Sequence, residues 1–255
     1  MNRKLWSSIV SLTILSGMLA LLVDIQSYST TAQANILTHS GWIDSIGYYH
    51  ISGEAENVGD SALKFVKITA TFYDSSESVV ATSFTYTSLK VLLPGRKSPF
   101  EVLLVYTTQA AKVHHYSLST EYSITSPIPT SLEILSHNSF VDIINYKHVV
   151  GEVRNIAGST ATYVKVAVTF YDSAGHVVAT SFTFSSPSDI DAGQKAPFEV
   201  LLVYTNRVAL IDSYSLTVES DQFALVPEFS SFLIPSLFII ATLLAVTICK
   251  RKHFI

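Results

Sequence analysis

Few residues in this chain have the type and spacing that chemistry at an active site would need. A Gly-x-Ser-x-Gly motif would present a nucleophilic serine on a sharp turn, and the sequence contains none. The single cysteine, Cys249, lies at the end of an apolar segment. This position does not favour a role as a thiolate nucleophile. There is no His-Glu-x-x-His zinc motif and no glycine-rich phosphate loop. We therefore expect no catalytic residues, no metal site and no cofactor.

Two pairs of recurring residues could ligate a metal ion, but each has a more common explanation. His50 and His148 both stand at the start of a predicted strand, where a structural or solvent-facing role is expected. Asp74 and Asp172 each follow a strand, so calcium ligation is one interpretation. An aspartate that caps the following turn is far more common. We expect the capping role.

The elements that hold these residues come in two copies. Residues 53–121 align without a gap with residues 151–219. The stretches 79–85 and 99–107 recur unchanged 98 residues later. Such a repeat indicates one fold used twice, with the proline-rich residues 126–130 as a semi-rigid linker.

Within each copy the hydrophobic period is two, which is typical of strands. Apolar residues occupy alternate positions of 66–72 and of 164–170, and we expect them to face a core. Alternate positions from Phe100 to Tyr106 should share the inward face of a later strand.

Turn signals separate these strands. Leu93-Pro94-Gly95 suits a type II turn, and 172–175 suits a short hairpin loop that ends in glycine. The first copy has Glu77 at the position of that glycine, which predicts a looser hairpin. Several short strands with turns at this spacing predict an all-β protein with two tandem β-sandwich domains, at 35–125 and 131–222.

A family resemblance agrees with this fold. The Phe-Tyr-Asp run at 72–74, the preceding Asn57 and a later Pro-Gly-x-x-x-Pro-Phe stretch resemble the FxLYD domain, a small immunoglobulin-like sandwich of prokaryotic envelope proteins. The second copy has Asn155 and the same run at 170–172, but Ala192 replaces the first proline of the turn. Phenylalanine also stands where the family prefers leucine. The resemblance implies a β-sandwich at the cell surface and no catalytic residues.

One strand in each copy is apolar on the side that should face solvent. Leu103 and Val105 accompany Glu101 there, and Leu201 and Val203 recur in the second copy. A solvated sheet face should be polar. Either loops cover this side, or it is a contact face between the copies or with a partner. We take the four residues as a possible contact face.

The first 34 residues have the features of a secretory signal. Arg3 and Lys4 precede the apolar segment 5–23, and Ala32-Gln33-Ala34 fits the small-residue pattern of a cleavage site. An uncleaved N-terminal anchor helix is the alternative. Either way, the following residues are expected outside the cytoplasm.

The other end predicts a single-pass anchor. Residues 232–249 are apolar over a length that can span a bilayer. The basic tail 250–255 should stay in the cytoplasm. A short juxtamembrane segment, 223–231, leads into the predicted transmembrane helix.

The juxtamembrane segment also contains a sorting motif. Pro227-Glu228-Phe229, followed by the apolar span and the basic tail, resembles the PEF-type C-terminal signal of archaeal surface proteins, which an archaeosortase reads. Many such signals continue with proline, where this chain has Ser230. A plain membrane anchor is the alternative.

The composition of the chain limits the classes of partner that it is expected to bind. The chain is 48% hydrophobic and only 14% charged, with a net charge of −4 and no cluster of basic residues that a nucleic acid would need. We expect a non-enzymatic, membrane-anchored cell-surface protein that displays two modules for structural or protein-binding roles in the envelope. The alternative is an extracytoplasmic accessory subunit of a membrane transport or secretion complex.

Overall fold

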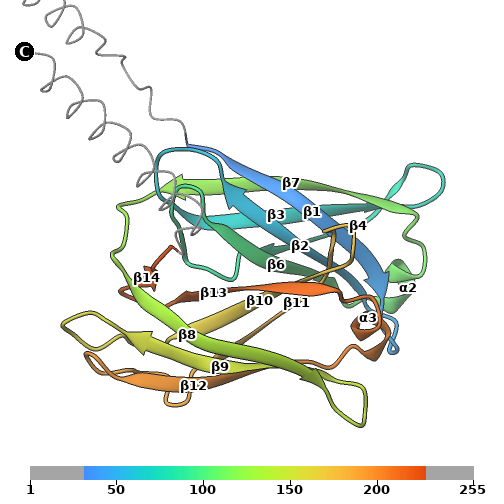
Figure 1. The fold of residues 1–255 in the computed structure, drawn as a ribbon. Helices are drawn as coiled ribbons and strands as arrows, with labels where there is room; N and C mark the ends of the chain where they lie inside the picture. Colours follow the sequence, from blue (N-terminus) through green and yellow to red (C-terminus); the bar gives the residue numbers. More distant parts are fainter. Residues whose placement is uncertain (1–31, 228–255) are drawn as a thin grey trace, which may run out of the picture. The chain divides into compact units, whose positions relative to one another are not determined.

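A computed structural model describes residues 32–227, which form an all-β, sandwich-like fold within one compact unit (Figure 1). The first repeat contains β1 (Ala34–Ile43), β2 (Tyr49–Asn57), β3 (Leu63–Tyr73), β4 (Val79–Tyr86), β5 (Val91–Leu92), β6 (Lys97–Leu104), α2 (Thr107–Ala110) and β7 (His115–Ile124). The second contains β8 (Thr130–Val141), β9 (Lys147–Asn155), β10 (Lys165–Tyr171), β11 (Val177–Phe184), β12 (Lys195–Leu202), α3 (Thr205–Val208), β13 (Ser213–Glu219) and β14 (Ala224–Leu225).

Several predicted segments lie outside the described residues. These are the signal segment up to residue 31, the transmembrane segment 232–249, the basic tail 250–255, and Glu228 and Phe229 of the sorting motif. Within 32–227, no helix has the length and apolar character needed to cross a bilayer.

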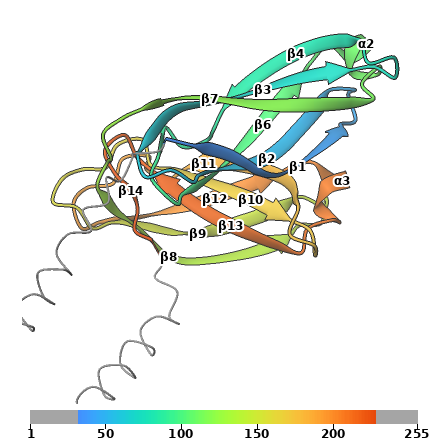
Figure 2. The same cartoon turned by 90° about the horizontal axis from the view of Figure 1, so that it is seen from above.

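The first repeat consists of two antiparallel sheets. One has the strand order β1-β2-β6, and the other places β3 between β4 and β7, with the short β5 also paired to β3. Figure 2 shows the strands from above. This arrangement gives each sheet one face toward a shared core and one face outward.

The second repeat has the same two layers, β8-β9-β12 and β11-β10-β13, but a small extra strand joins them. Ala224 of β14 pairs antiparallel with Glu219 of β13 and parallel with Thr130 of β8. The paired residues of this repeat therefore extend to Leu225.

Each repeat has its own hydrophobic core cluster. The alternate positions of 66–72 are at most 2% exposed, and those of 164–170 are fully buried, so the predicted inward faces are confirmed. Phe100, Val102 and Leu104 also face inward. Tyr106 is 66% exposed, so the prediction that it shares this inward face is wrong. β6 ends at Leu104, and the chain then turns into α2, which breaks the period.

The type II turn is confirmed in both repeats. Gly95 has a φ of 72°, and the Arg96 amide donates to the Leu93 carbonyl at 3.0 Å. Gly193 has a φ of 74° and makes the same turn without a preceding proline. Glycine alone is therefore sufficient for this turn, because it supplies the positive φ without a steric cost.

The β3–β4 hairpin is no looser than its counterpart in the second repeat, so the prediction of a looser loop is wrong. Glu77 adopts a φ of 61°, and the Asp74 amide donates to the Ser78 carbonyl at 3.0 Å, the same length as in the second repeat. The Asp74 carboxylate caps the turn by accepting from the amides of Ser76 and Ser78. The hydrogen bonds and the cap thus hold a non-glycine residue in the left-handed region.

A glycine at this position should stabilise the protein. Glu77→Gly is expected to raise the free energy of unfolding by about 0.5–1 kcal/mol, because relief of the left-handed strain exceeds the added entropy of the unfolded chain. Gly175→Ala, the reverse change in the second repeat, should lower it by about 1 kcal/mol. Urea unfolding of both variants measures this, and equal stability of Glu77→Gly and the wild type would contradict it.

Candidate functional site

The contact between the two repeats involves several buried polar side chains. We call the outward face of β1-β2-β6, and of its counterpart β8-β9-β12, face A. We call the outward face of β3-β4-β7, and of β10-β11-β13, face B. Face A of the first repeat packs on face B of the second through β1, β2, β6, β10 and β11. Trp42, Ala167 and Val177 are at most 7% exposed, yet belong to neither core cluster, because this contact buries them.

A buried carboxylate lies on this inter-repeat contact. Glu54 on β2 is 3% exposed and accepts hydrogen bonds from the Tyr171 hydroxyl at 2.7 Å and the Thr169 hydroxyl at 3.1 Å. Lys97 lies 3.8 Å from the same carboxylate. Burial, together with the nearby negative charge, raises the pKa of Tyr171 to about 12. Tyr171 is therefore a hydrogen-bond donor here and not a base.

Aromatic and cationic side chains close one end of the contact. The ring of Trp42 stacks on His50 at 4.2 Å and meets Tyr204 edge-on at 4.7 Å. The Arg207 guanidinium lies 5.4 Å from the Trp42 ring and donates to the Ser40 hydroxyl at 3.0 Å. Such a cation–π contact stabilises a desolvated interface.

Each recurring histidine lies between two carboxylates. His50 Nδ1 is 2.8 Å from Glu101, and its Nε2 is 3.1 Å from Asp44. His148 has the same arrangement with Asp142 and Glu199. The carboxylates occupy opposite ring nitrogens, so the three groups do not converge on one point. Within residues 32–227, no group of three or more His, Cys, Asp or Glu side chains is placed to hold a metal ion.

These contacts favour charged histidines. Burial alone would lower the pKa of His50, but its hydrogen bonds to Glu101 and Asp44 raise it overall. The hydrogen bonds to Glu199 and Asp142 raise the pKa of His148. Each histidine thus joins two carboxylates of its own repeat.

Stability should therefore fall as the pH rises through the raised histidine pKa values. A raised folded pKa contributes stability that is complete below the unfolded value of 6.5 and is lost above the folded one. Urea unfolding between about pH 5 and pH 9 should show this loss in the wild type. A His50→Gln, His148→Gln variant should be less stable overall but lose much less over that range. Parallel curves would contradict the assignment.

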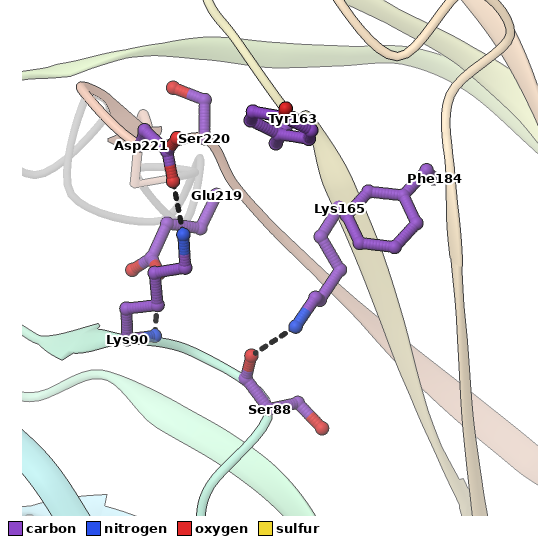
Figure 3. Close-up of a pocket in the computed structure, with 8 residues that line it drawn as sticks. All are labelled: Ser88, Lys90, Tyr163, Lys165, Phe184, Glu219, Ser220 and Asp221. Atoms are coloured by element: carbon purple, nitrogen blue, oxygen red, sulfur yellow. Dashed lines mark hydrogen bonds and ion pairs between the residues drawn. The ribbon is translucent and has the colours of Figure 1, made fainter.

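A pocket of about 240 Å³ lies at the other end of the inter-repeat contact (Figure 3). Tyr163 and Phe184 form one side of it, and Lys90 of the first repeat enters from the other. Tyr163 adopts a φ of 52°, as does Phe65 in the first repeat, so an irregularity at the start of the strand turns each ring outward.

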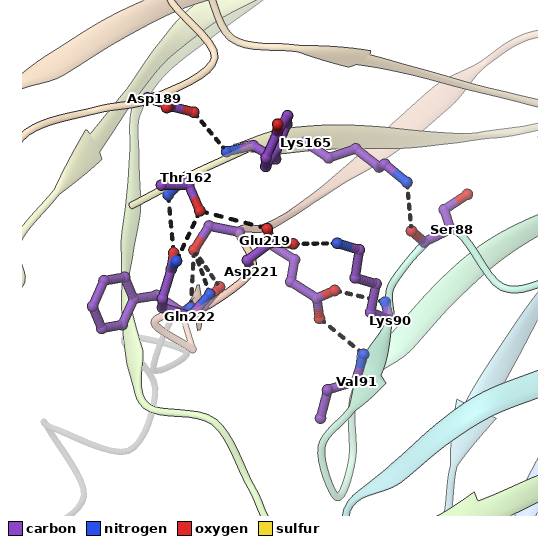
Figure 4. Close-up of polar contacts among 12 residues, drawn as sticks. Ser88, Lys90, Val91, Thr162, Lys165, Asp189, Glu219, Asp221 and Gln222 are labelled. Carbon is purple, nitrogen blue, oxygen red and sulfur yellow. Dashed lines mark hydrogen bonds and ion pairs between the residues drawn. The ribbon is translucent and has the colours of Figure 1, made fainter. Parts of the chain in front are cut away.

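Every charged side chain that lines this pocket has a partner in the other repeat. Lys90 forms an ion pair with Asp221, and Lys165 donates to the Ser88 carbonyl at 3.3 Å. Glu219 is 4% exposed and accepts from the backbone amides of Lys90 at 2.6 Å and Val91 at 3.2 Å (Figure 4).

The pKa shifts in the pocket follow from its burial. Burial raises the pKa of Glu219, although the hydrogen bonds from Lys90 and Val91 oppose this shift. Burial, with the charge of Lys90, lowers the pKa of Lys165. The charged groups of this pocket therefore all take part in contacts between the repeats.

Arg96 adds a third connection. It donates to the Thr217 hydroxyl at 2.8 Å and to the Val218 carbonyl at 3.2 Å. Its burial lowers the pKa of the guanidinium. A guanidinium suits this place because it can donate to several acceptors at once.

The contact between the repeats does not bury the residues predicted as a contact face. Leu103 is on face A of the first repeat but stays 36% exposed, and Leu201 in the second repeat is 39% exposed. Val105 and Val203 are 43% and 44% exposed. The contact between the repeats buries none of the four, so their role with a partner stays a prediction. Pro227 of the sorting motif is exposed beside the cavity that contains Glu54.

Sequence reasoning missed the residues that join the repeats, although a signal was present. Three cationic residues on the contact are replaced by uncharged residues in the other copy. These replacements are Lys90 by Ser188, Arg96 by Gln194, and Arg207 by Gln109. A charge kept in only one copy of a duplication marks a position where the two copies have different surroundings.

Comparisons with known proteins identify no family. No family model and no curated protein matches the chain. Among solved structures, red sea bream transglutaminase is similar over 79% of this chain and 32% of its own, with 8% identity and a TM-score of 0.25. The exo-chitosanase CsxA of Amycolatopsis orientalis is similar over 75% and 26%, with 12% identity and a TM-score of 0.28. The chain spans a third or less of these proteins, and a likeness at this level indicates no activity.

Proposed function

We propose that the chain is a non-enzymatic cell-surface protein, anchored in the membrane, whose two immunoglobulin-like domains act as one stiff module in structural or protein-binding roles. The inter-repeat contact is the observation that carries this proposal. Buried Glu54 and Glu219 connect the repeats at two separate places, which restricts bending at the linker. A stiff module holds a binding surface at a fixed orientation.

Two further observations support the assignment to domains and compartment. Each repeat has its own core cluster and its own pair of antiparallel layers, the architecture of an immunoglobulin-like sandwich. The apolar segments at 5–23 and 232–249 and the basic tail favour an extracytoplasmic position for the repeats.

The membrane topology of the chain, measured on intact cells, tests this proposal. Antibodies against residues 32–227 should recover the chain from the membrane fraction after alkaline carbonate washing. An impermeant amine reagent should label exposed lysines such as Lys112 without lysis. Recovery in the cytosolic fraction, or labelling only after lysis, would refute a surface-anchored protein.

Crosslinking on the same cells, followed by mass spectrometry, distinguishes a structural role in the envelope from a role as an accessory subunit. Capture of other envelope proteins would support structural display. Stoichiometric capture of one integral-membrane complex would instead assign the chain as an accessory subunit of that complex.

A further inference from the structure

The inter-repeat contact joins two different faces, so each repeat keeps one face that this contact does not use. Face A of the first repeat meets face B of the second. Face A of the second repeat and face B of the first are left uncovered within residues 32–227. A contact between unlike faces of like units does not close on itself, and its repetition generates an open row.

The uncovered faces present apolar side chains whose counterparts are buried. Val79 on face B of the first repeat is 59% exposed, whereas the equivalent Val177 is fully buried. Phe140 on face A of the second repeat is 47% exposed, whereas the equivalent Trp42 is 7% exposed. Phe140 stacks on its histidine at 4.6 Å, much as Trp42 does. Both repeats therefore present equivalent side chains on faces A and B, but the inter-repeat contact covers only one copy of each face.

The central hydrogen-bonding groups are repeated as well. Glu152 occupies the position of Glu54, with its carboxylate 2.8 Å from Lys195. Thr71 and Tyr73 on face B of the first repeat occupy the positions of the two hydroxyl donors. The two hydroxyl donors thus lie on the first repeat, and the carboxylate acceptor lies on the second.

The differences between the copies make a contact between chains weaker than the contact within one. The uncharged Ser188, Gln194 and Gln109 replace the cations that strengthen the inter-repeat contact. His115 also stacks on Tyr73 at 4.8 Å, where the second repeat has a serine. The linker gives the partner within the chain a high effective concentration as well. Each chain therefore completes its own contact first.

We infer that a second copy of this chain docks face B of its first repeat on face A of the second repeat, so that chains join head to tail in an open row. Glu152 of one chain accepts hydrogen bonds from Thr71 and Tyr73 of the next. Phe140 of the first chain covers Tyr106 of the second, in the way that Trp42 covers Tyr204.

Site-directed crosslinking of the full chain, reconstituted in vesicles of neutral phospholipid, tests this arrangement. The chain contains only Cys249, so a Cys249→Ser background is free of cysteine. Asn138 and Gln109 occupy the positions of Ser40 and Arg207, which meet across the inter-repeat contact, so they should meet between chains. A double variant with Gln109→Cys and Asn138→Cys, treated with a short bis-maleimide, should give a ladder of dimers, trimers and longer products. Each single variant alone should stay monomeric, while a mixture of the two should stop at dimers.

Val79→Glu in the double-cysteine background should reduce the ladder by at least about tenfold, because docking would bury an unpaired carboxylate. Val79 is exposed, so the substitution leaves the fold intact. Ile143→Glu, a matched change at a fully exposed position in the β8–β9 loop, should leave the ladder unchanged. If the double-cysteine variant gives no more ladder than its Val79→Glu derivative, or if Gln109→Cys alone gives dimers, head-to-tail docking is overturned.

Discussion

Replacing Glu54 with alanine is expected to lower the free energy of unfolding by about 2–3 kcal/mol, whereas Glu152→Ala should change it by less than about 0.5 kcal/mol. The two glutamates occupy equivalent positions of the repeat but differ in burial. Glu54 is 3% exposed and accepts from two hydroxyls of the second repeat, which alanine would leave without an acceptor. Glu152 forms only a solvent-exposed ion pair with Lys195.

Trp42 is a natural probe for this measurement because its ring lies on the inter-repeat contact. The only other tryptophan, Trp6, can be replaced by phenylalanine. Urea unfolding of the full chain in detergent, followed by tryptophan fluorescence, then reports on the contact. Glu54→Gln keeps one acceptor oxygen for Tyr171 and should recover most of the loss. Equal effects of Glu54→Ala and Glu152→Ala would show that the contact contributes no stability through this residue.

Asn57→Ala and Asn155→Ala are each expected to cost about 2–4 kcal/mol, because each removes the partner of three backbone groups, one of which is buried. The Asn57 amide donates to the carbonyls of Ser61 and Leu92, both at 2.8 Å, and its oxygen accepts from the Gly59 amide at 3.0 Å. Asn155 makes the same three contacts in the second repeat. Both asparagines are fully buried.

The two asparagine variants should cost equally, in contrast to the two glutamates, since each asparagine acts within its own repeat. Asn155→Asp retains an acceptor but loses both donors, so it should be at least as destabilising as alanine. Asn206→Ala, at an exposed position in α3, is the control and should change stability by less than about 0.5 kcal/mol. Urea unfolding of this set decides the matter, and a small effect of Asn155→Asp would show that the donated hydrogen bonds are unimportant.

The local features of this protein follow from patterns of neighbouring residues. Period-two alternation indicated which residues of 66–72 and 164–170 face the cores, because successive side chains in a strand point to opposite sides. Glycine at 95 and 175 marked the turns, and Asp74 and Asp172 cap the hairpins as expected. These features depend on residues close together in the chain.

Which outward face is covered, and at which residues, depends instead on the packing of the repeats. The stretch 79–85 is identical to 177–183, yet its first valine is 59% exposed and the second copy's is fully buried. The amide of Val177 meets the Thr38 hydroxyl, 139 residues away along the chain. Alternation shows that a side chain points outward, but cannot show what packs on it. That outcome depends on the packing of one whole repeat against the other, which no short stretch of sequence encodes.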